Sequence, residues 1–325
     1  MEPASTASTK AALMLLAALF AVHVYRAAAT PATADEAYSY DRYVRPPIRE
    51  VLAAYDPGNH LLYTLLAKRS IGLFRLSEFS LRLPGLLAGS LYLWAVWLFA
   101  RRIARPPALA LAVAAALALN PWSLDLYHTA WGYGLPVTLA LCALDLMLAA
   151  PLPPRNLNLA AVCLGLAVAD RPRFLLPAAA LAAVCLVVLL RRGPPAAAFL
   201  IFAERFLVPA VATAFIILVL LMSHAHSAVR PAPPTRAEEA GARSLAQALR
   251  AIAGARPVRI AASPSLEPLI NFYRARYRMR NWERVAVNAP DASFDYYVLT
   301  SEDAAWAAQK PSIVLARAAG LVLAR

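Results

Sequence analysis

Long apolar runs constrain this chain more than any other feature of its sequence. Seven of them approach the roughly 20 residues that an α-helix needs to cross a bilayer. They lie at about 11–29, 83–100, 107–122, 134–150, 157–170, 173–190 and 203–223. Hydrophobic residues make up 61% of the chain and charged residues only 16%, whereas a soluble domain carries about a quarter charged residues. The sequence therefore predicts a mainly α, polytopic membrane protein with about seven transmembrane helices.

Lysine and arginine residues in the short connections predict the orientation of these helices. The connections on one side carry basic residues, and the opposite connection at 120–133 has none. The basic residues are Lys10, Arg101, Arg102, Arg105, Arg155, Arg191 and Arg192. Such loops remain cytoplasmic, so we expect a cytoplasmic N-terminus in the cell (inner or plasma) membrane. A cleaved signal peptide over 1–29 is the alternative, because Ala27, Ala28 and Ala29 would suit cleavage.

The net charge of +13 fits this distribution of arginine at helix ends and in loops. Arginine at these places contacts lipid headgroups. No RNA-binding or DNA-binding motif accompanies the charge, so we expect no nucleic-acid partner.

The chain changes character after residue 223. A proline-rich stretch predicts a linker over 224–242, and 243–325 alternates between helical and strand patterns. The predicted elements are helices at Ser244–Ala253, Ser265–Tyr277 and Ser301–Gln309, and strands at Pro257–Ala262, Arg284–Val287, Asp295–Thr300 and Ser312–Ala316. We expect a transmembrane module over 1–223, with 30–82 as a long external loop containing interfacial helices, and a small α/β extracytoplasmic domain over 243–325.

An acidic pair, Asp35 and Glu36, follows the first predicted span, and His60 lies further along the same loop. A carboxylate beside a membrane costs free energy unless it is solvated or used. Asp35 is the candidate general base and Glu36 its supporting acid. The alternative is a solvated loop pair. His60 is a candidate to bind a phosphate or, with a carboxylate, a metal; alternatively it starts an interfacial helix that Asn59 caps.

Three segments of this loop together resemble the start of GT-C glycosyltransferases. They are Asp35-Glu36, Asn59-His60-Leu61-Leu62-Tyr63, and Ser77-Glu78 with Leu81-Arg82-Leu83-Pro84. The resemblance covers roughly 1–190 and is closest to the branch of protein O-mannosyltransferases and lipid A aminoarabinose transferases. Leu61 departs from the pattern, since family members often have proline after the loop histidine. The chain is also shorter than many relatives, which suggests a shortened member of the family.

The resemblance implies a seven-helix module that takes a sugar from a polyprenyl-phosphate lipid outside the cytoplasmic membrane. It implies transfer with inversion to a lipid, glycan or protein acceptor, with Asp35 as the base. The family also places a basic residue near the turn that here reads Asp170-Arg171-Pro172-Arg173.

Basic side chains are the candidates to bind the donor phosphate. Arg171 and Arg173 are expected at the external end of two spans, where guanidinium groups form charge-assisted bonds to phosphate oxygens. Lys68 and Arg69 could attract the same phosphate. For both pairs the alternative is contact with lipid headgroups.

Aromatic and histidine side chains are the candidates for sugar or acceptor contact, with an aromatic interfacial belt as the alternative. They are Tyr38, Tyr63, His128, Trp131 and Tyr133. The sequence thus favours an inverting glycosyltransferase. The alternative is a non-catalytic membrane component that binds lipid-linked glycan or partner proteins. No cofactor is certain. A divalent metal stays open, although no second histidine lies at ligand spacing from His60 to support it.

Overall fold

The computed structural model describes residues 6–53, 58–149, 152–191, 194–207, 210, 235–254, 256–287, 293–300, 302–303 and 314–324. Contacts divide the chain into two compact units. The first unit comprises Met1–Ala28, Pro47–Ser70 and Leu81–Ser227. The second unit comprises Ala29–Pro46, Ile71–Ser80 and Ala228–Arg325.

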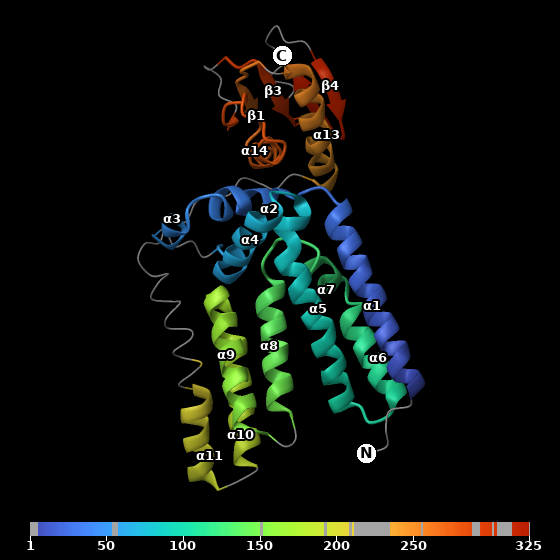
Figure 1. The fold of residues 1–325 in the computed structure, drawn as a ribbon, viewed down its shortest axis with the longest axis vertical. Helices are drawn as coiled ribbons and strands as arrows, with labels where there is room; N and C mark the ends of the chain where they lie inside the picture. The colour runs from blue at the N-terminus through green and yellow to red at the C-terminus, as the bar shows by residue number, and fades with distance from the viewer. Residues whose placement is uncertain are drawn as a thin grey trace. The chain divides into compact units, whose positions relative to one another are not determined.

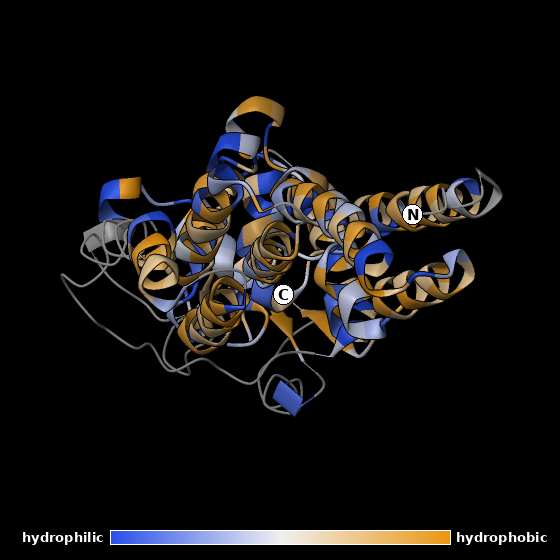
Figure 2. Ribbon diagram, turned by 90° about the horizontal axis from the view of Figure 1, so that it is seen from below, coloured by the Kyte–Doolittle hydropathy of each residue, from blue (hydrophilic) through white to orange (hydrophobic). Residues whose placement is uncertain are grey.

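The first unit is built from helices wherever the structure describes it (Figure 1). Those that lie wholly or mostly in it are α1 (Thr6–Ala29), α3 (Ile48–Ala53), α4 (Leu61–Phe74), α5 (Glu78–Ile103), α6 (Pro107–Ala118), α7 (Pro121–Leu126), α8 (Gly134–Met147), α9 (Pro154–Asp170), η2 (Pro172–Phe174), α10 (Leu175–Leu190), α11 (Pro195–Phe202) and η3 (Ala203–Leu207). Most residues along these helices are hydrophobic (Figure 2). Helices therefore occupy six of the seven predicted spans.

Three of the described helices are long and apolar enough to cross a membrane, which indicates a membrane-associated protein. They are Thr9–Ala29 in α1, Glu78–Ile103, which is α5, and Pro172–Leu190, which joins η2 to α10. α6 and α8 are apolar but shorter. The predicted span at 203–223 lies mostly outside the described residues. The expectation of seven transmembrane helices therefore stays a prediction.

Two apolar clusters hold the first unit together. In one, α1 and α5 pack against α6, whose Ala110, Ala114 and Ala118 are spaced one helical turn apart. Alanine at this spacing lets helix backbones approach closely, as in many membrane interfaces. In the other, α8, α9, α10, α11 and η3 surround buried residues that include Met147 and Leu164. α8 and α9 form an antiparallel hairpin within this cluster.

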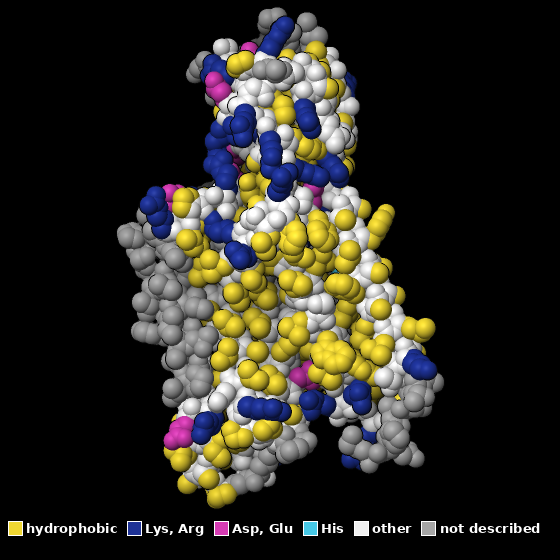
Figure 3. All heavy atoms as spheres, in the orientation of Figure 1, with side chains coloured by type: hydrophobic (Ala, Val, Ile, Leu, Met, Phe, Trp, Pro, Cys, Tyr) yellow, Lys and Arg dark blue, Asp and Glu magenta, His cyan; other side chains and the backbone are white. Residues whose placement is uncertain are grey.

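Basic residues mark one end of the first unit. Arg101 and Arg102 end α5, Arg155 begins α9 and Arg191 follows α10, and these helix ends lie at the same end of the unit (Figure 1). Hydrophobic side chains cover the adjoining face of the helices (Figure 3). This distribution agrees with the side that the sequence predicts to be cytoplasmic. The orientation itself stays a prediction.

The second unit combines a small mixed sheet with helices (Figure 1). Its elements are α2 (Ala34–Ser39), η1 (Tyr40–Val44), α13 (Arg236–Ala253), β1 (Ile260–Ala262), α14 (Glu267–Arg276), β2 (Ala286–Val287), β3 (Tyr296–Leu299), β4 (Val314–Ala318) and β5 (Leu321–Ala324). The strand order is β2-β1-β3-β5-β4, with β1 parallel to β2 and β3 and the other pairs antiparallel. In the register, Ala261 lies opposite Ala286 on one side and Tyr297 on the other.

The segment that carries the acidic pair packs against α13 and α14 within the second unit. The Ala32 amide donates to the Tyr273 hydroxyl at 3.2 Å, and the Tyr40 ring meets Phe272 edge-on at 5.6 Å. Arg284 pairs with Asp41 at 2.5 Å. A short polar segment close to the N-terminus is thus fixed by residues more than 200 positions later in the chain.

Capping boxes explain where α2 and α13 begin. In each, a threonine side chain accepts from the N3 amide, and the N3 glutamate accepts from the threonine amide. The pairs are Thr33 with Glu36 and Thr235 with Glu238. The second box starts α13 at Arg236, eight residues before the predicted helix at Ser244. The predicted linker 224–242 lies mostly outside the described residues.

Candidate functional site

A buried polar cluster in the first unit joins His60 to the end of α9. His60 Nδ1 lies 3.0 Å from Asp170 Oδ2, and Arg171 Nη1 lies 2.5 Å from His60 Nε2. All three side chains are buried, with Asp170 only 1% exposed. Three ionisable groups inside an apolar unit carry a large desolvation cost unless they bond to one another. The cluster is therefore a specific arrangement and not a chance meeting of loops.

Asp170 also fixes the helix that carries His60. Its Oδ1 accepts the Tyr63 amide at 3.0 Å, and Tyr63 occupies the third position of α4. A side-chain oxygen at this place satisfies an amide that lacks a partner in the helix itself. One carboxylate thus caps α4 and orients the histidine that precedes it.

Tyr133 and Gly132 form a wall of the cluster. The Arg171 guanidinium lies 3.9 Å from the centroid of the Tyr133 ring, and His60 meets the same ring edge-on at 4.7 Å. Gly132 adopts a φ of +79°, and a Cβ built on it would lie 2.5 Å from His60 Cγ. Glycine is therefore required where the 120–133 connection passes the imidazole.

The cluster has the chemistry of an anion site. Among the described residues, Arg171 forms no salt bridge with a carboxylate, and its one side-chain hydrogen bond goes to a ring nitrogen of His60. A buried guanidinium has five N–H donors and favours bidentate bonds to phosphate or carboxylate oxygens. His60, Tyr63, Tyr133 and Arg171 are the predicted site residues that the structure brings together. Asp170 was quoted in the sequence turn but was not assigned to the site.

The acidic pair belongs to the second unit, where its two members differ. Asp35 is exposed in the first turn of α2, whereas Glu36 is fully buried and accepts the Thr33 amide at 2.8 Å in the capping box. Glu239 accepts the Ala34 amide at 2.8 Å. Burial raises the pKa of the Glu239 carboxyl, and the carboxylates of Glu36 and Asp35 raise it further.

The other predicted phosphate-binding residues also lie in the first unit. Lys68 is half-buried in α4, where burial lowers the pKa of its ammonium group and the Glu50 carboxylate opposes that shift. Arg69 follows on α4 and is exposed. Arg173 is exposed in η2.

Of the remaining predicted contact residues, Tyr63 reaches the cluster through its amide, whereas its hydroxyl bonds elsewhere. The Tyr63 hydroxyl donates to the Leu81 carbonyl at 3.0 Å, and buried His128 Nδ1 lies 2.7 Å from the Leu124 carbonyl. Trp131 Nε1 is buried and has no hydrogen-bond partner among the described residues. Tyr38 belongs to the second unit, where its ring meets Tyr43 edge-on at 6.2 Å.

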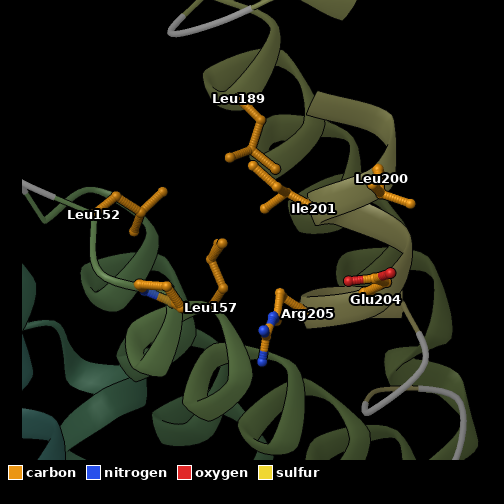
Figure 4. Close-up of a pocket in the computed structure, with 8 residues that line it drawn as sticks. Leu152, Leu157, Leu189, Leu200, Ile201, Glu204 and Arg205 are labelled. Atoms are coloured by element: carbon orange, nitrogen blue, oxygen red, sulfur yellow. The ribbon is translucent and has the colours of Figure 1, made fainter. Parts of the chain in front are cut away.

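A separate cavity of about 510 Å³ opens between α9, α10, α11 and η3 in the first unit (Figure 4). Its lining is mostly leucine and isoleucine, with Glu204 and Arg205 at one side. None of the predicted site residues lines it. The cavity is therefore separate from the His60 cluster.

No group of three or more histidine, cysteine, aspartate or glutamate side chains in the described parts of the chain is placed to hold a metal ion. No protein-family model, curated protein or solved structure matches the chain. The resemblance to GT-C glycosyltransferases therefore stays an expectation from the sequence.

Proposed function

We propose that this protein is an inverting glycosyltransferase of the GT-C type. It takes a sugar from a polyprenyl-phosphate donor and transfers it to a lipid, glycan or protein acceptor on the extracytoplasmic side of the cell membrane.

The buried Arg171 guanidinium is the observation that carries the proposal. It has no carboxylate partner among the described residues and is bonded to His60 and stacked on Tyr133. A buried guanidinium with no carboxylate bonded directly to it favours an oxyanion as its ligand. A lipid-linked sugar phosphate is such an oxyanion, and its prenyl chain suits the apolar helices around the cluster. Lys68, Arg69 and Arg173 add positive charge to the same unit.

Asp35 is the proposed base, and the local structure favours it over Glu36. Glu36 is occupied as an acceptor in its capping box, whereas Asp35 is exposed one residue earlier in the same turn. In the reaction, the acceptor oxygen attacks C1 of the sugar while Asp35 takes the hydroxyl proton. The bond from C1 to the phosphate oxygen breaks, and its electron pair leaves with the polyprenyl phosphate. Glu36 supports the turn on which Asp35 lies.

Transfer by the purified protein tests the proposal. The full chain in detergent is incubated with radiolabelled polyprenyl-phosphate sugars, and release or transfer of label is compared between wild type and Asp35→Asn. Removal of a general base lowers the rate by roughly 10²–10⁴-fold. Glu283→Gln is the matched control, because Glu283 is an exposed carboxylate of the same unit with 67% side-chain exposure.

Loss of transfer in Asp35→Asn, with Glu283→Gln unaffected, supports the enzyme and its base. Activity that does not respond to Asp35→Asn removes the catalytic assignment. If the protein still binds the lipid but releases no sugar from any donor, the result favours a non-catalytic component that binds lipid-linked glycan.

A further inference from the structure

His60 lies between a group that can only accept and a group that can only donate. The Asp170 carboxylate accepts hydrogen bonds, so the proton on Nδ1 of His60 points toward it. Arg171 has only donors, so Nε2 of His60 is the acceptor and carries no proton. These two contacts together require the neutral imidazole with its proton on Nδ1.

The cluster then has no net charge. Asp170 carries a negative charge, Arg171 a positive one, and the neutral ring lies between them. Among the described residues, the titratable groups that face the ring are Asp170 and Arg171 from the end of α9 and Tyr133 at the start of α8. Its own segment contributes Asn59 and Tyr63, and neither carries a charge.

An anion that binds Arg171 changes this balance. The guanidinium turns its N–H donors to the phosphate oxygens, and Nε2 of His60 loses its donor. The ring would then present a bare acceptor to an anion while Nδ1–H still faces Asp170. An imidazole between two anions is stabilised by taking a second proton.

We propose that Asp170 is a positioning residue that makes His60 take up one proton when the donor phosphate binds. This inference rests on the proposed function, because it assigns the phosphate to the site at Arg171. The proton comes from water, and the new Nε2–H donates to a phosphate oxygen. Asp170 fixes the orientation of the ring through Nδ1 and stabilises the imidazolium that forms.

The proton has a role in the transfer step. When the bond between C1 and the phosphate oxygen breaks, that oxygen receives the electron pair and the phosphate gains a second negative charge. The His60 imidazolium and the Arg171 guanidinium then face a dianion with two positive charges. The leaving group is thereby stabilised without a metal being required of these residues.

Calorimetry on the full-length protein in detergent tests the coupling. The probe is a methyl diester of a short prenyl phosphate, which carries one charge and has no group that titrates near neutral pH. Binding heats in two buffers of different ionisation enthalpy give the number of protons taken up. We expect about one proton per site on the alkaline side, with affinity falling by about tenfold per pH unit there.

Variants separate positioning from stability. In Asp170→Asn we expect no proton uptake and an affinity that no longer depends on pH, because the amide cannot stabilise an imidazolium. Asp170→Glu restores part of the uptake. Thr64→Val is the matched control. Thr64 is buried on α4, and its hydroxyl donates to Asn59 at 2.8 Å and not to the cluster, so proton uptake in this variant stays at the wild-type value.

Each outcome decides between the claims. The role of Asp170 is overturned if wild type binds the diester without proton uptake, or if Asp170→Asn takes up as many protons as wild type. Either result still supports a phosphate site at Arg171. If wild type fails to bind the diester at any pH, the phosphate site at Arg171 is wrong, and this inference is lost with it. If Asp170→Asn does not fold, the wild-type proton count and Asp170→Glu still decide.

Discussion

Gly132→Ala is the sharpest perturbation of the His60 cluster. The φ of +79° at Gly132 lies in the left-handed region, where a residue with a Cβ costs about 1–2 kcal/mol. The added Cβ would also lie 2.5 Å from His60 Cγ and 2.7 Å from its Cβ. To relieve this contact, the imidazole must retreat by roughly 1 Å, which opens its bonds to Asp170 and Arg171. Because a buried bond to a charged group contributes about 1.5–3 kcal/mol, the loss of one of these bonds together with the backbone cost gives a total of about 2.5–5 kcal/mol.

Two other glycines separate the causes in a thermal unfolding assay. Gly320 has a φ of +83° and open space where a Cβ would lie, so Gly320→Ala measures the backbone cost alone, about 1–2 kcal/mol. Gly72 lies in α4 with nothing within 4 Å, so Gly72→Ala is expected to be neutral or to stabilise by up to about 1 kcal/mol. If Gly132→Ala unfolds at the same temperature as Gly320→Ala, the glycine is not what lets His60 reach its partners.

Two further predictions concern the second unit. Because the pKa of Glu239 is raised in the folded state, its ionisation opposes folding, and stability falls as pH rises from below its ordinary pKa through the folded value. Glu239→Gln keeps an oxygen for the Ala34 amide, so we expect the variant to be more stable than wild type at pH 7 and the difference to shrink at pH 4 in thermal unfolding. A difference that grows toward acid would contradict the sign. Thr33→Ala removes the capping box of α2 at a cost of about 1 kcal/mol. Amide hydrogens of α2 should then exchange roughly fivefold faster than in wild type, while those of α13 keep their rates. Exchange rates in α2 equal to those of wild type would show that the cap contributes nothing.

The helices were the most predictable part of the fold, because uninterrupted apolar runs leave few alternatives to a helix. α5 and α10, for example, lie close to the predicted spans at 83–100 and 173–190. Most short elements of the second unit were also predicted: β1, β2, β3 and α14 lie within their predicted ranges, and β4 overlaps its own. The sequence did not predict β5, because Leu321–Ala324 shows no alternation of polar and apolar residues, and its place depends on pairing with β3 and β4.

Local polar signals were the other source of error. Thr33-Ala34-Asp35-Glu36 has the spacing of a capping box, and that signal was available to assign Glu36 to a helix start. His60 and Arg171 were each nominated for a phosphate, but their mutual bond joins residues 111 positions apart. No local sequence pattern predicts a bond between residues so far apart in the chain. Asp170 could have been added because a carboxylate at the end of an apolar helix needs a partner.

The packing of the N-terminal polar segment has a consequence for synthesis of the chain. Ala32 bonds Tyr273, 241 residues later, and Asp41 bonds Arg284, 243 residues later. At ribosomal rates of about 5–20 residues per second, roughly 10–50 s separate the appearance of these partners. The apolar helices between them emerge throughout that interval, whereas the turn that carries Asp35 has no α14 to pack against. A nascent chain released before Tyr273 therefore lacks both Tyr273 and Arg284, two of the partners that hold this segment, even when all of its apolar helices have been made.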